Sequence, residues 1–258
     1  MDGLNFLGEL FSQGLSYSSI NTARSALSAL FACGEGAQFG NNNMVTRFMK
    51  GVYCVRSSLP RYKETWDISR VLNHIRSWHP LSQLNLKKLT LKTVSLMAII
   101  SMQRSQTLQA LEIGENLTMG SEECTFMIKS LLKTSKPNHH LGYVTFKAYP
   151  DDHALCVLSC IREYIKRTEA LRGENNRLFI SFVKPHRQVS TETIRRWLKA
   201  TLELCGIDTT KFKAHSFRAA ATSAASQANV PIEIILKTAN WNNAKTFRKF
   251  YEKTIVTA

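Results

Sequence analysis

One segment of the chain departs from the helical spacing of apolar residues seen elsewhere, and it limits the folds open to the sequence. Within residues 111–149, the short runs CTFMIKSLLK and GYVTFKAY are rich in Ile, Val, Phe and Tyr. They flank the polar, turn-like KTSKPNHH. Such runs on either side of a turn are typical of a β-hairpin. The sequence therefore predicts one hairpin in an otherwise helical chain.

Apolar residues at helical spacing predict helices through most of the remaining chain. Near the N-terminus, apolar residues recur at this spacing after possible caps at Ser18 and Ser19, namely Ile20, Ala23, Leu27, Leu30 and Phe31. Residues 34–43 (GEGAQFGNNN) form an expected loop. The expected helices lie at about residues 20–31, 44–55, 68 to Pro80, 86–102, 153–168, 191–204, 215–227, 231–238 and 243–252. The fold class is therefore mainly α with a small antiparallel β-sheet.

A stretch rich in basic and turn-forming residues divides the chain. SSLPRYKET places Arg61 and Lys63 beside Pro60, a composition typical of an extended linker. We predict a small helical domain over 1–58, a basic linker over 59–66 and a larger domain over 67–258. A basic, extended linker suits the crossing of a phosphate backbone, although an ordinary surface connection has the same composition.

Net charge suggests the class of partner. Thirty-four Lys and Arg against nineteen Asp and Glu give a formal charge of +15, which favours a polyanion such as nucleic acid. A membrane surface, or a basic soluble protein with no polyanionic partner, stays open on charge alone. The longest apolar stretch, near Val94–Ile100, is too short to span a membrane. The acidic N-terminus MDGLNFLGEL does not resemble a signal peptide.

The cysteines give no sign of a disulfide framework or a metal centre. Cys156 and Cys160 follow His153 at helical spacing, but His139 or His140 would be needed as a further ligand, and no zinc-site pattern supports this. We expect reduced thiols and no metal. The six cysteines are Cys33, Cys54, Cys124, Cys156, Cys160 and Cys205.

Most common enzyme motifs are missing, so a reaction on DNA must rely on basic groups. The chain has no phosphate-binding glycine loop, no GxSxG motif and no spaced trio of carboxylates for two metal ions. KAHSFRAAATSAA places His215 and Arg218 on one face of a helix start. Taken singly, these and the remaining candidates are ordinary structural residues. The remaining candidates are Arg104 after a long apolar helix, Lys133 and Lys136 in the hairpin, Trp241, and Tyr251 beside Arg248 and Lys249.

Their order along the chain resembles the tyrosine recombinase (phage integrase) family. HSFR matches the family's HxxR motif, and NWNNAKTFRKFY resembles its terminal segment, in which Trp replaces His in some members. Tyr251 follows Trp241 by ten residues, one more than in many bacterial members. The phrases FLGELFSQGLSYSSINTARSAL, RFMKGVY, TWDIS and TFRKFY look most like recombinases of DIRS-type retrotransposons of eukaryotes. The N-terminal module looks like a truncated core-binding domain.

The resemblance implies a metal-independent DNA strand transferase with no cofactor. Tyr251 would attack the scissile phosphate and form a 3′-phosphotyrosyl bond, with His215 assisting proton transfer. Arg104, Arg218 and Trp241 would bind the phosphate, and Lys133 would protonate the leaving 5′-oxygen, a role that Lys136 is also close enough to take.

The resemblance also implies contacts and an assembly. Arg61, Lys63, Lys136, Arg248 and Lys249 would contact double-stranded DNA. The expected assembly is a homotetramer in synapsis and a monomer when free, without membrane association. A mobile element of eukaryotes would place the protein in the nucleus, and another origin in the cytoplasm. The alternatives are a type IB topoisomerase-like enzyme, a domesticated non-catalytic DNA-binding protein, and a purely structural helical protein.

Overall fold

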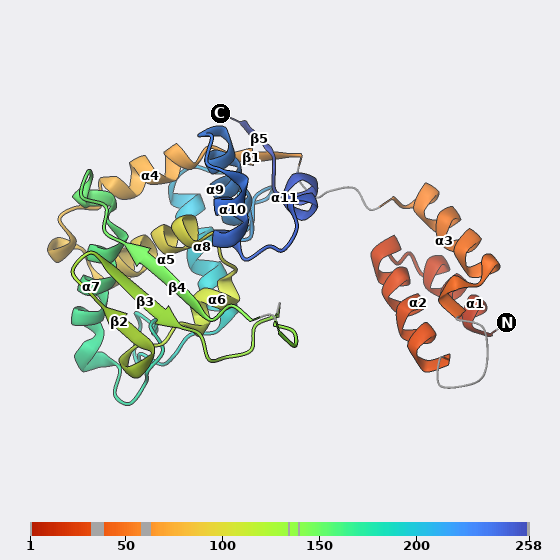
Figure 1. Cartoon of the computed structure of the whole chain (residues 1–258), viewed down its shortest axis with the longest axis horizontal. Coiled ribbons are helices and arrows are strands. Elements are labelled where there is room, and N and C mark those ends of the chain that lie inside the picture. The colour runs from red at the N-terminus through yellow and green to blue at the C-terminus, as the bar shows by residue number, and fades with distance from the viewer. Residues whose placement is uncertain (1, 32–38, 58–62, 134, 139, 257–258) are drawn as a thin grey trace. The chain divides into compact units, whose positions relative to one another are not determined.

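A computed structural model describes residues 2–31, 39–57, 63–133, 135–138 and 140–256 (Figure 1). The chain divides into two units, Met1–Arg61 and Tyr62–Ala258, described here one at a time as the N-terminal and C-terminal units. The division falls within the predicted linker. Residues 59–62 of that linker, including Arg61, lie outside the described residues, as do Cys33 and His139.

In its described residues, 2–31 and 39–57, the N-terminal unit contains three helices and a short 3-10 turn. They are α1 (Asp2–Ser12), α2 (Tyr17–Phe31), η1 (Phe39–Asn41) and α3 (Asn43–Val55). Leu7, Ile20, Val45, Met49 and Val52 form its buried core. Of the predicted apolar face, Ala23 and Leu27 pack partly buried against this core, whereas Leu30 and Phe31 are exposed. The predicted caps at Ser18 and Ser19 are wrong. Helix α2 begins earlier, and the hydroxyl of Ser16 accepts the backbone N–H of Ser19 at 3.3 Å.

The C-terminal unit is built around helix α5 (Leu86–Ser101), which contacts α7, α8 and α9. Twelve of its sixteen residues are buried, polar ones such as Thr90, Thr93 and Ser95 included, because these helices pack around it, and this confirms the predicted buried helix. Even Lys92 is fully buried, with its Nζ donating to the Trp78 carbonyl at 2.5 Å. The other helices of this unit are α4 (Ile68–Arg76), α6 (Ser105–Ala110), α7 (Val157–Thr168), α8 (Thr191–Leu204), α9 (Ser216–Gln227), α10 (Ile232–Ala239) and α11 (Ala244–Phe250), with 3-10 turns at Leu81–Gln83, Gly114–Asn116, His153–Leu155 and Glu169–Leu171.

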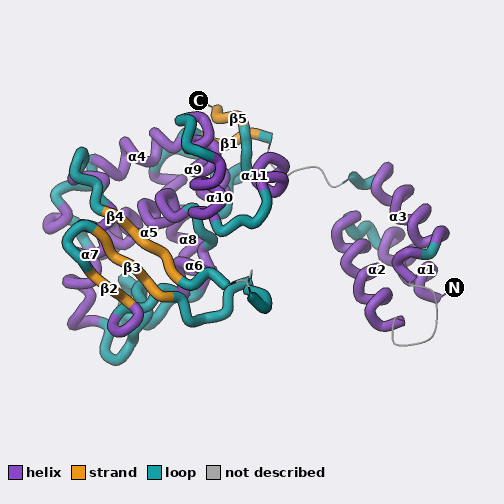
Figure 2. Tube along the Cα trace, in the orientation of Figure 1, coloured by secondary structure: helices purple, strands orange, loops and turns teal. Residues whose placement is uncertain are grey.

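The predicted hairpin is confirmed. Strands β3 (Glu123–Met127) and β4 (Tyr143–Lys147) pair antiparallel, with Phe126 opposite Val144. A third strand, β2 (Leu117–Met119), pairs with β3. The sequence did not predict β2, because three residues are too few to show an alternating pattern. The sheet lies on the side of the unit away from α9, α10 and α11 (Figures 1 and 2).

A second, two-stranded sheet joins the start and the end of the C-terminal unit. Strand β1 (Glu64–Trp66) pairs in parallel with β5 (Thr254–Val256). The indole of Trp66, which is 2% exposed, donates to the hydroxyl of Ser216 at 2.8 Å. Residues 64–66, assigned to the linker from sequence, therefore belong structurally to the C-terminal unit. Their pairing partner is too distant in the sequence for a local pattern to reveal it.

Further expectations concern metals, thiols and membranes. Among the described residues, Cys54, Cys124, Cys156, Cys160 and Cys205 are free thiols. No group of three His, Cys, Asp or Glu side chains in the described ranges gathers as metal ligands would. No helix in the same ranges has the length and apolar character needed to cross a bilayer.

Candidate active site

Arg104 is held at a sharp turn between two helices. Helix α5 ends at Ser101 and is followed by its C-cap Met102, whose backbone is left-handed with φ of 52°. Arg104 is the N-cap of α6. The side chain of Gln103, between them, is buried and donates from Nε2 to the Thr238 carbonyl at 2.6 Å. This bond ties the turn to the end of α10. The half-buried Arg104 consequently projects from a fixed backbone.

Arg218 is a buried cation with free hydrogen-bond donors. It lies in the first turn of α9, three residues after the N-cap His215, and is 1% exposed. Its Nη2 donates to the Ala239 carbonyl at 2.5 Å, while Nε and Nη1 have no partner among the described residues. Its guanidinium carbon lies 4.3 Å from the ring centre of Trp241 and 5.4 Å from that of Tyr251. No carboxylate of the described residues forms an ion pair with it.

The electrostatics of Arg218 favour binding of an anion. Burial, and next the positive charge of Arg104, lower the pKa of Arg218 to about 9, so it remains charged at pH 7. A buried charge without a counter-ion is costly, and so are buried N–H groups without acceptors. A phosphate oxygen would supply both the charge and the acceptors. This arrangement is suited to a phosphate-binding site.

Tyr251 lies against both HxxR residues. Its hydroxyl is 3.1 Å from Nε2 of His215, and its ring centre is 4.4 Å from that of Trp241. The expected helix over 243–252 is too long, because α11 ends at Phe250 and Tyr251 is its C-cap with φ of −126°. Ser223 of α9 holds this backbone by donating to the Tyr251 carbonyl at 2.7 Å and accepting the Lys253 N–H at 3.0 Å.

His215 is suited to accept a proton from Tyr251. Loss of hydration, followed by the positive charges of Arg218, Arg104 and Arg195, lowers the pKa of His215 to about 4. Water still reaches the exposed part of His215, and the three positive charges act on the ring as well as the loss of hydration. The imidazole is therefore neutral at pH 7, and a neutral ring nitrogen can act as a base.

Trp241 adds a third free donor. Its indole Nε1 is buried without a partner among the described residues, and its ring is half-buried against Arg218 and Tyr251. The backbone N–H of Trp241 donates to the Leu236 carbonyl at 2.9 Å, which fixes the residue just after α10. Trp241 and Arg218 together thus provide three donors that lack an acceptor.

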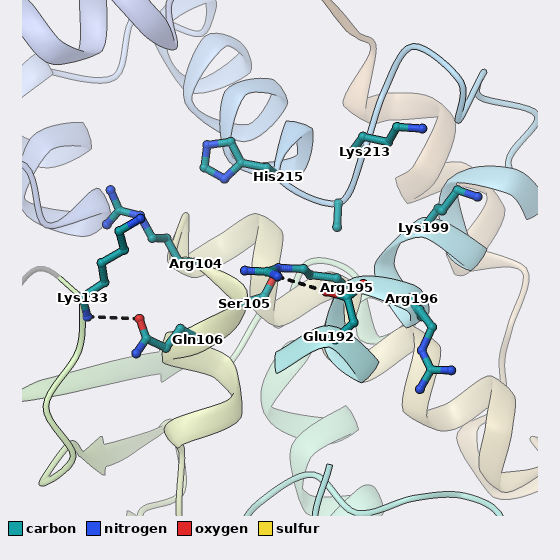
Figure 3. Close-up of a pocket in the computed structure, with 11 residues that line it drawn as sticks. Arg104, Ser105, Gln106, Lys133, Glu192, Arg195, Arg196, Lys199, Lys213 and His215 are labelled. Carbon is teal, nitrogen blue, oxygen red and sulfur yellow. Dashed lines mark hydrogen bonds and ion pairs between the residues drawn. The ribbon is translucent and has the colours of Figure 1, made fainter. Parts of the chain in front are cut away.

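A cavity of about 490 Å³ opens beside these groups (Figure 3). His215, Arg104 and Lys133 line it, and Lys133 donates its backbone N–H to Oε1 of Gln106 at 3.0 Å. The exposed Lys136 does not line it. The residues lining the cavity are Arg104, Ser105, Gln106, Lys133, Glu192, Arg195, Arg196, Lys199, Lys213, Ala214 and His215.

The remaining sequence candidates do not line this cavity. Arg218, Trp241 and Tyr251 do not line it but adjoin it through His215. Lys63, Arg248 and Lys249 are exposed and do not line it either. All six predicted catalytic residues therefore gather in one region, whereas the predicted DNA-contacting residues that are described lie on the open surface.

The family model of the phage integrase family matches residues 67–255. The chain belongs to this family. No curated protein sequence matches the chain.

Solved structures of tyrosine recombinases and integrases share the fold. The XerH site-specific recombinase in a post-cleavage complex has a TM-score of 0.65 at 16% identity, with 96% of this chain and 68% of that chain covered. A lambda integrase dimer bound to a COC' core site has a TM-score of 0.55 at 14% identity, with coverages of 97% and 63%. The Tn1549 transposon integrase with circular intermediate DNA has a TM-score of 0.60 at 14% identity, with coverages of 96% and 80%.

Sequence reasoning missed the basic wall of this integrase-family site. Helix α8 contributes Arg195, Arg196 and Lys199, and Lys213 lies just before α9. Glu192 forms a 3.0 Å ion pair with Arg195. A signal was present, because charged residues at 192, 195, 196 and 199 recur at the spacing of one helix face, opposite the apolar Ile194 and Leu198.

Proposed function

We propose that this phage integrase family member cleaves and rejoins double-stranded DNA in site-specific recombination, with Tyr251 as its nucleophile. One observation carries the proposal. The Tyr251 hydroxyl lies 3.1 Å from a neutral His215, beside a buried Arg218 that has two N–H groups without acceptors. A nucleophile, a base and a phosphate-binding cation are thereby assembled in one place.

The reaction follows from this geometry. The Tyr251 oxygen attacks the scissile phosphorus while its proton passes to Nε2 of His215. Negative charge on the non-bridging oxygens is stabilised by the donors of Arg218, Arg104 and Trp241, a type of stabilisation worth about 2.7–4 kcal/mol per donor in other enzymes.

The second half of the step releases the DNA strand. The bond from phosphorus to the 5′-oxygen breaks, and Lys133 gives that oxygen a proton. The phosphodiester energy is kept in the 3′-phosphotyrosyl bond. A 5′-hydroxyl from another strand then attacks this bond, which reverses the chemistry and rejoins the DNA.

The wider assembly is part of the proposal. The net charge of +15 and the basic cavity support binding to DNA phosphates, with further contacts from Arg61, Lys63, Lys136, Arg248 and Lys249. The helical N-terminal unit would act as a core-binding domain, with residues 59–63 as the linker. A lambda integrase tetramer bound to a Holliday junction shares the fold at a TM-score of 0.53, which supports a homotetramer in synapsis; the free protein would be a monomer.

The origin and location of the protein are inferred from sequence phrases. The resemblance of TFRKFY and RFMKGVY to DIRS-type recombinases supports a retrotransposon enzyme acting in the nucleus of a eukaryotic cell. The solved structures that share its fold include recombinases and a transposon integrase. A topoisomerase-like activity has no such support.

The test uses a suicide duplex with a nick close to the scissile phosphate. Wild-type protein should form a covalent adduct that survives denaturing electrophoresis. Tyr251→Phe should bind DNA with little change, because other phosphate contacts dominate affinity, but should form no adduct. Tyr143→Phe, at an exposed tyrosine of β4, is the matched control and should react normally. An adduct formed by Tyr251→Phe would assign the nucleophile to another residue, with Tyr143, Tyr149 and Tyr164 the next to test.

A further inference from the structure

The loop that carries Lys133 is held by side-chain hydrogen bonds from two directions. This Lys133 loop, residues 128–142, joins β3 to β4, and all of it except residues 134 and 139 is described. Ile128 and Leu132 are buried, whereas Leu131 is 82% exposed. The apolar contacts therefore fix only part of the loop, and the position of Lys133 depends on polar contacts.

The first polar contact comes from α6. Gln106 accepts the backbone N–H of Lys133 through Oε1 at 3.0 Å. Gln106 lies two residues after Arg104, the N-cap of the same helix. The hydrogen bond therefore joins the Lys133 loop directly to the turn that carries one of the phosphate-binding arginines. Figure 3 shows this bond and the side chains of Arg104 and Lys133 at the same cavity.

The second set of contacts comes from His140, on the far side of the loop. Nε2 of His140 lies 2.8 Å from the Ile128 carbonyl, which can only accept, so Nε2 carries the proton. In the neutral ring Nδ1 then accepts, and it lies 2.8 Å from the hydroxyl of Ser135. That hydroxyl donates to Nδ1 and accepts the backbone N–H of Leu132 at 2.9 Å.

The chain of bonds from Ile128 through His140 and Ser135 reaches the residue just before Lys133. The backbone N–H of Ser135 also donates to the Leu132 carbonyl at 2.8 Å, which closes a turn around Lys133. With a proton on Nε2, His140 bonds to the Ile128 carbonyl and to Ser135 at the same time. We call Ser135 and His140 the loop clip.

We propose that Gln106 and His140 are positioning residues that hold Lys133 where it protonates the leaving 5′-oxygen. This inference rests on the proposed function, in which Lys133 is the general acid. A general acid contributes about 10²–10⁴-fold only if its proton lies within hydrogen-bond reach of the leaving atom. Misplacement by about 1 Å can cost about 10²-fold. A flexible lysine on an exposed loop meets this requirement only if its backbone is fixed.

The test distinguishes a displaced acid from general damage to the site. Suicide substrates are prepared with either the normal 5′-oxygen or a 5′-bridging sulfur at the scissile phosphate. The thiolate leaves without a proton, so loss or displacement of the acid does not slow the sulfur substrate. The variants Lys133→Ala, Lys136→Ala, Gln106→Met and His140→Phe are compared with wild type in single-turnover cleavage of both substrates.

We expect Lys133→Ala to slow cleavage of the oxygen substrate by about 10²–10⁴-fold, and Gln106→Met and His140→Phe to slow it by at least about 10-fold. On the sulfur substrate all three should cleave within about threefold of wild type, because the chemistry no longer needs the acid. His153→Phe, at an exposed histidine in the turn before α7, is the matched control and should match wild type on both substrates.

Each other outcome overturns the inference. A defect of His140→Phe that persists on the sulfur substrate would mean that the loop clip supports the fold or DNA binding instead. Normal cleavage of the oxygen substrate by both Gln106→Met and His140→Phe would show that Lys133 needs neither. If Lys136→Ala, and not Lys133→Ala, cleaved the oxygen substrate slowly and the sulfur substrate normally, the general acid would be Lys136. Failure of the proposed function looks different, because wild type would then form no adduct with either substrate.

Discussion

Replacing Arg218 with methionine tests whether its buried charge serves catalysis or folding. Methionine keeps a long, unbranched side chain but removes the charge and its donors. We expect Arg218→Met to slow adduct formation by about 10²–10³-fold, as for other lost charge-stabilising donors. We also expect the folding free energy at pH 7 to change by less than about 2 kcal/mol. For a side chain that is 1% exposed, so small a change would be unusual.

The expected stability follows from opposing contributions at this site. Lowering the pKa of Arg218 from its ordinary value to about 9 means that the folded protein carries a cost for the charged form of about 5 kcal/mol at pH 7, at about 1.36 kcal/mol per pKa unit. Because this basic group has a lower pKa in the folded protein than in the unfolded chain, the cost to stability persists below pH 9 and falls as the pH rises above 9. Methionine removes that cost, but it also loses the packing of the guanidinium against Trp241 and Tyr251 and leaves the Ala239 carbonyl without its donor, which together cost about 3–5 kcal/mol.

The assay uses a feature of the sequence. All four tryptophans, Trp66, Trp78, Trp197 and Trp241, lie in the C-terminal unit, so fluorescence during urea unfolding of the full chain reports on that unit. With urea m-values of about 1–3 kcal/mol per molar, 2 kcal/mol moves the midpoint by about 0.7–2 M, which is easily measured.

Arg172→Met is the matched control for this experiment. Arg172 is also buried, but its guanidinium donates to Arg177 and Leu178 carbonyls and to the Thr168 hydroxyl, away from the cavity. Its loss should destabilise the unit by about 2–4 kcal/mol, because three acceptors lose their donor, while cleavage by the folded protein stays normal. If Arg218→Met destabilised the unit by more than about 4 kcal/mol, the guanidinium would be a structural group and the reasoning would be refuted.

Further predictions concern ions and pH. DNA affinity should fall with salt at a log–log slope of about −0.9 per phosphate neutralised. A slope near zero would show that the basic surface does not bind DNA phosphates. Cleavage should proceed in EDTA, because Arg104 and Arg218 stabilise the phosphate charge, and an absolute need for Mg²⁺ would contradict this. With the pKa of His215 lowered to about 4, cleavage should persist as the pH falls to about 5 and decline near 4, and His215→Gln should lack this decline. Because the unfolded histidine binds its proton below about 6.5, this group also lowers stability as the pH falls from 6.5 toward 4, measurable by urea unfolding.

Much of the helical framework was predictable because most of these helices bury one apolar face against the core. Helices α3, α4 and α8 show regular apolar spacing, and α5 contains a nearly continuous apolar run from Val94 to Ile100, so their existence follows from local sequence. The hairpin of β3 and β4 was equally visible, since its two strands are close in sequence and joined by a turn. The order of Arg, Lys, HxxR, Trp and Tyr also identified the family before any geometry was known.

The sequence could not reveal features that depend on contacts between distant segments. Strand β1 gains its hydrogen bonds from β5 at the other end of the chain, and three residues carry no periodic pattern. The end of α11 before Tyr251 is stabilised by Ser223 of another helix. Local propensity therefore extended that helix too far.

The amino-acid sequence by itself determined which residue types are available for phosphate chemistry and in what order. Only the tertiary structure decided that Arg218 keeps two free donors, that His215 is neutral beside Tyr251, and that Lys133 rather than Lys136 lines the cavity. The physical reason is that charge states and unsatisfied donors depend on burial and on neighbours in space. Those neighbours come from α5, α6, α9, α10 and the end of the chain, which meet only in the folded protein.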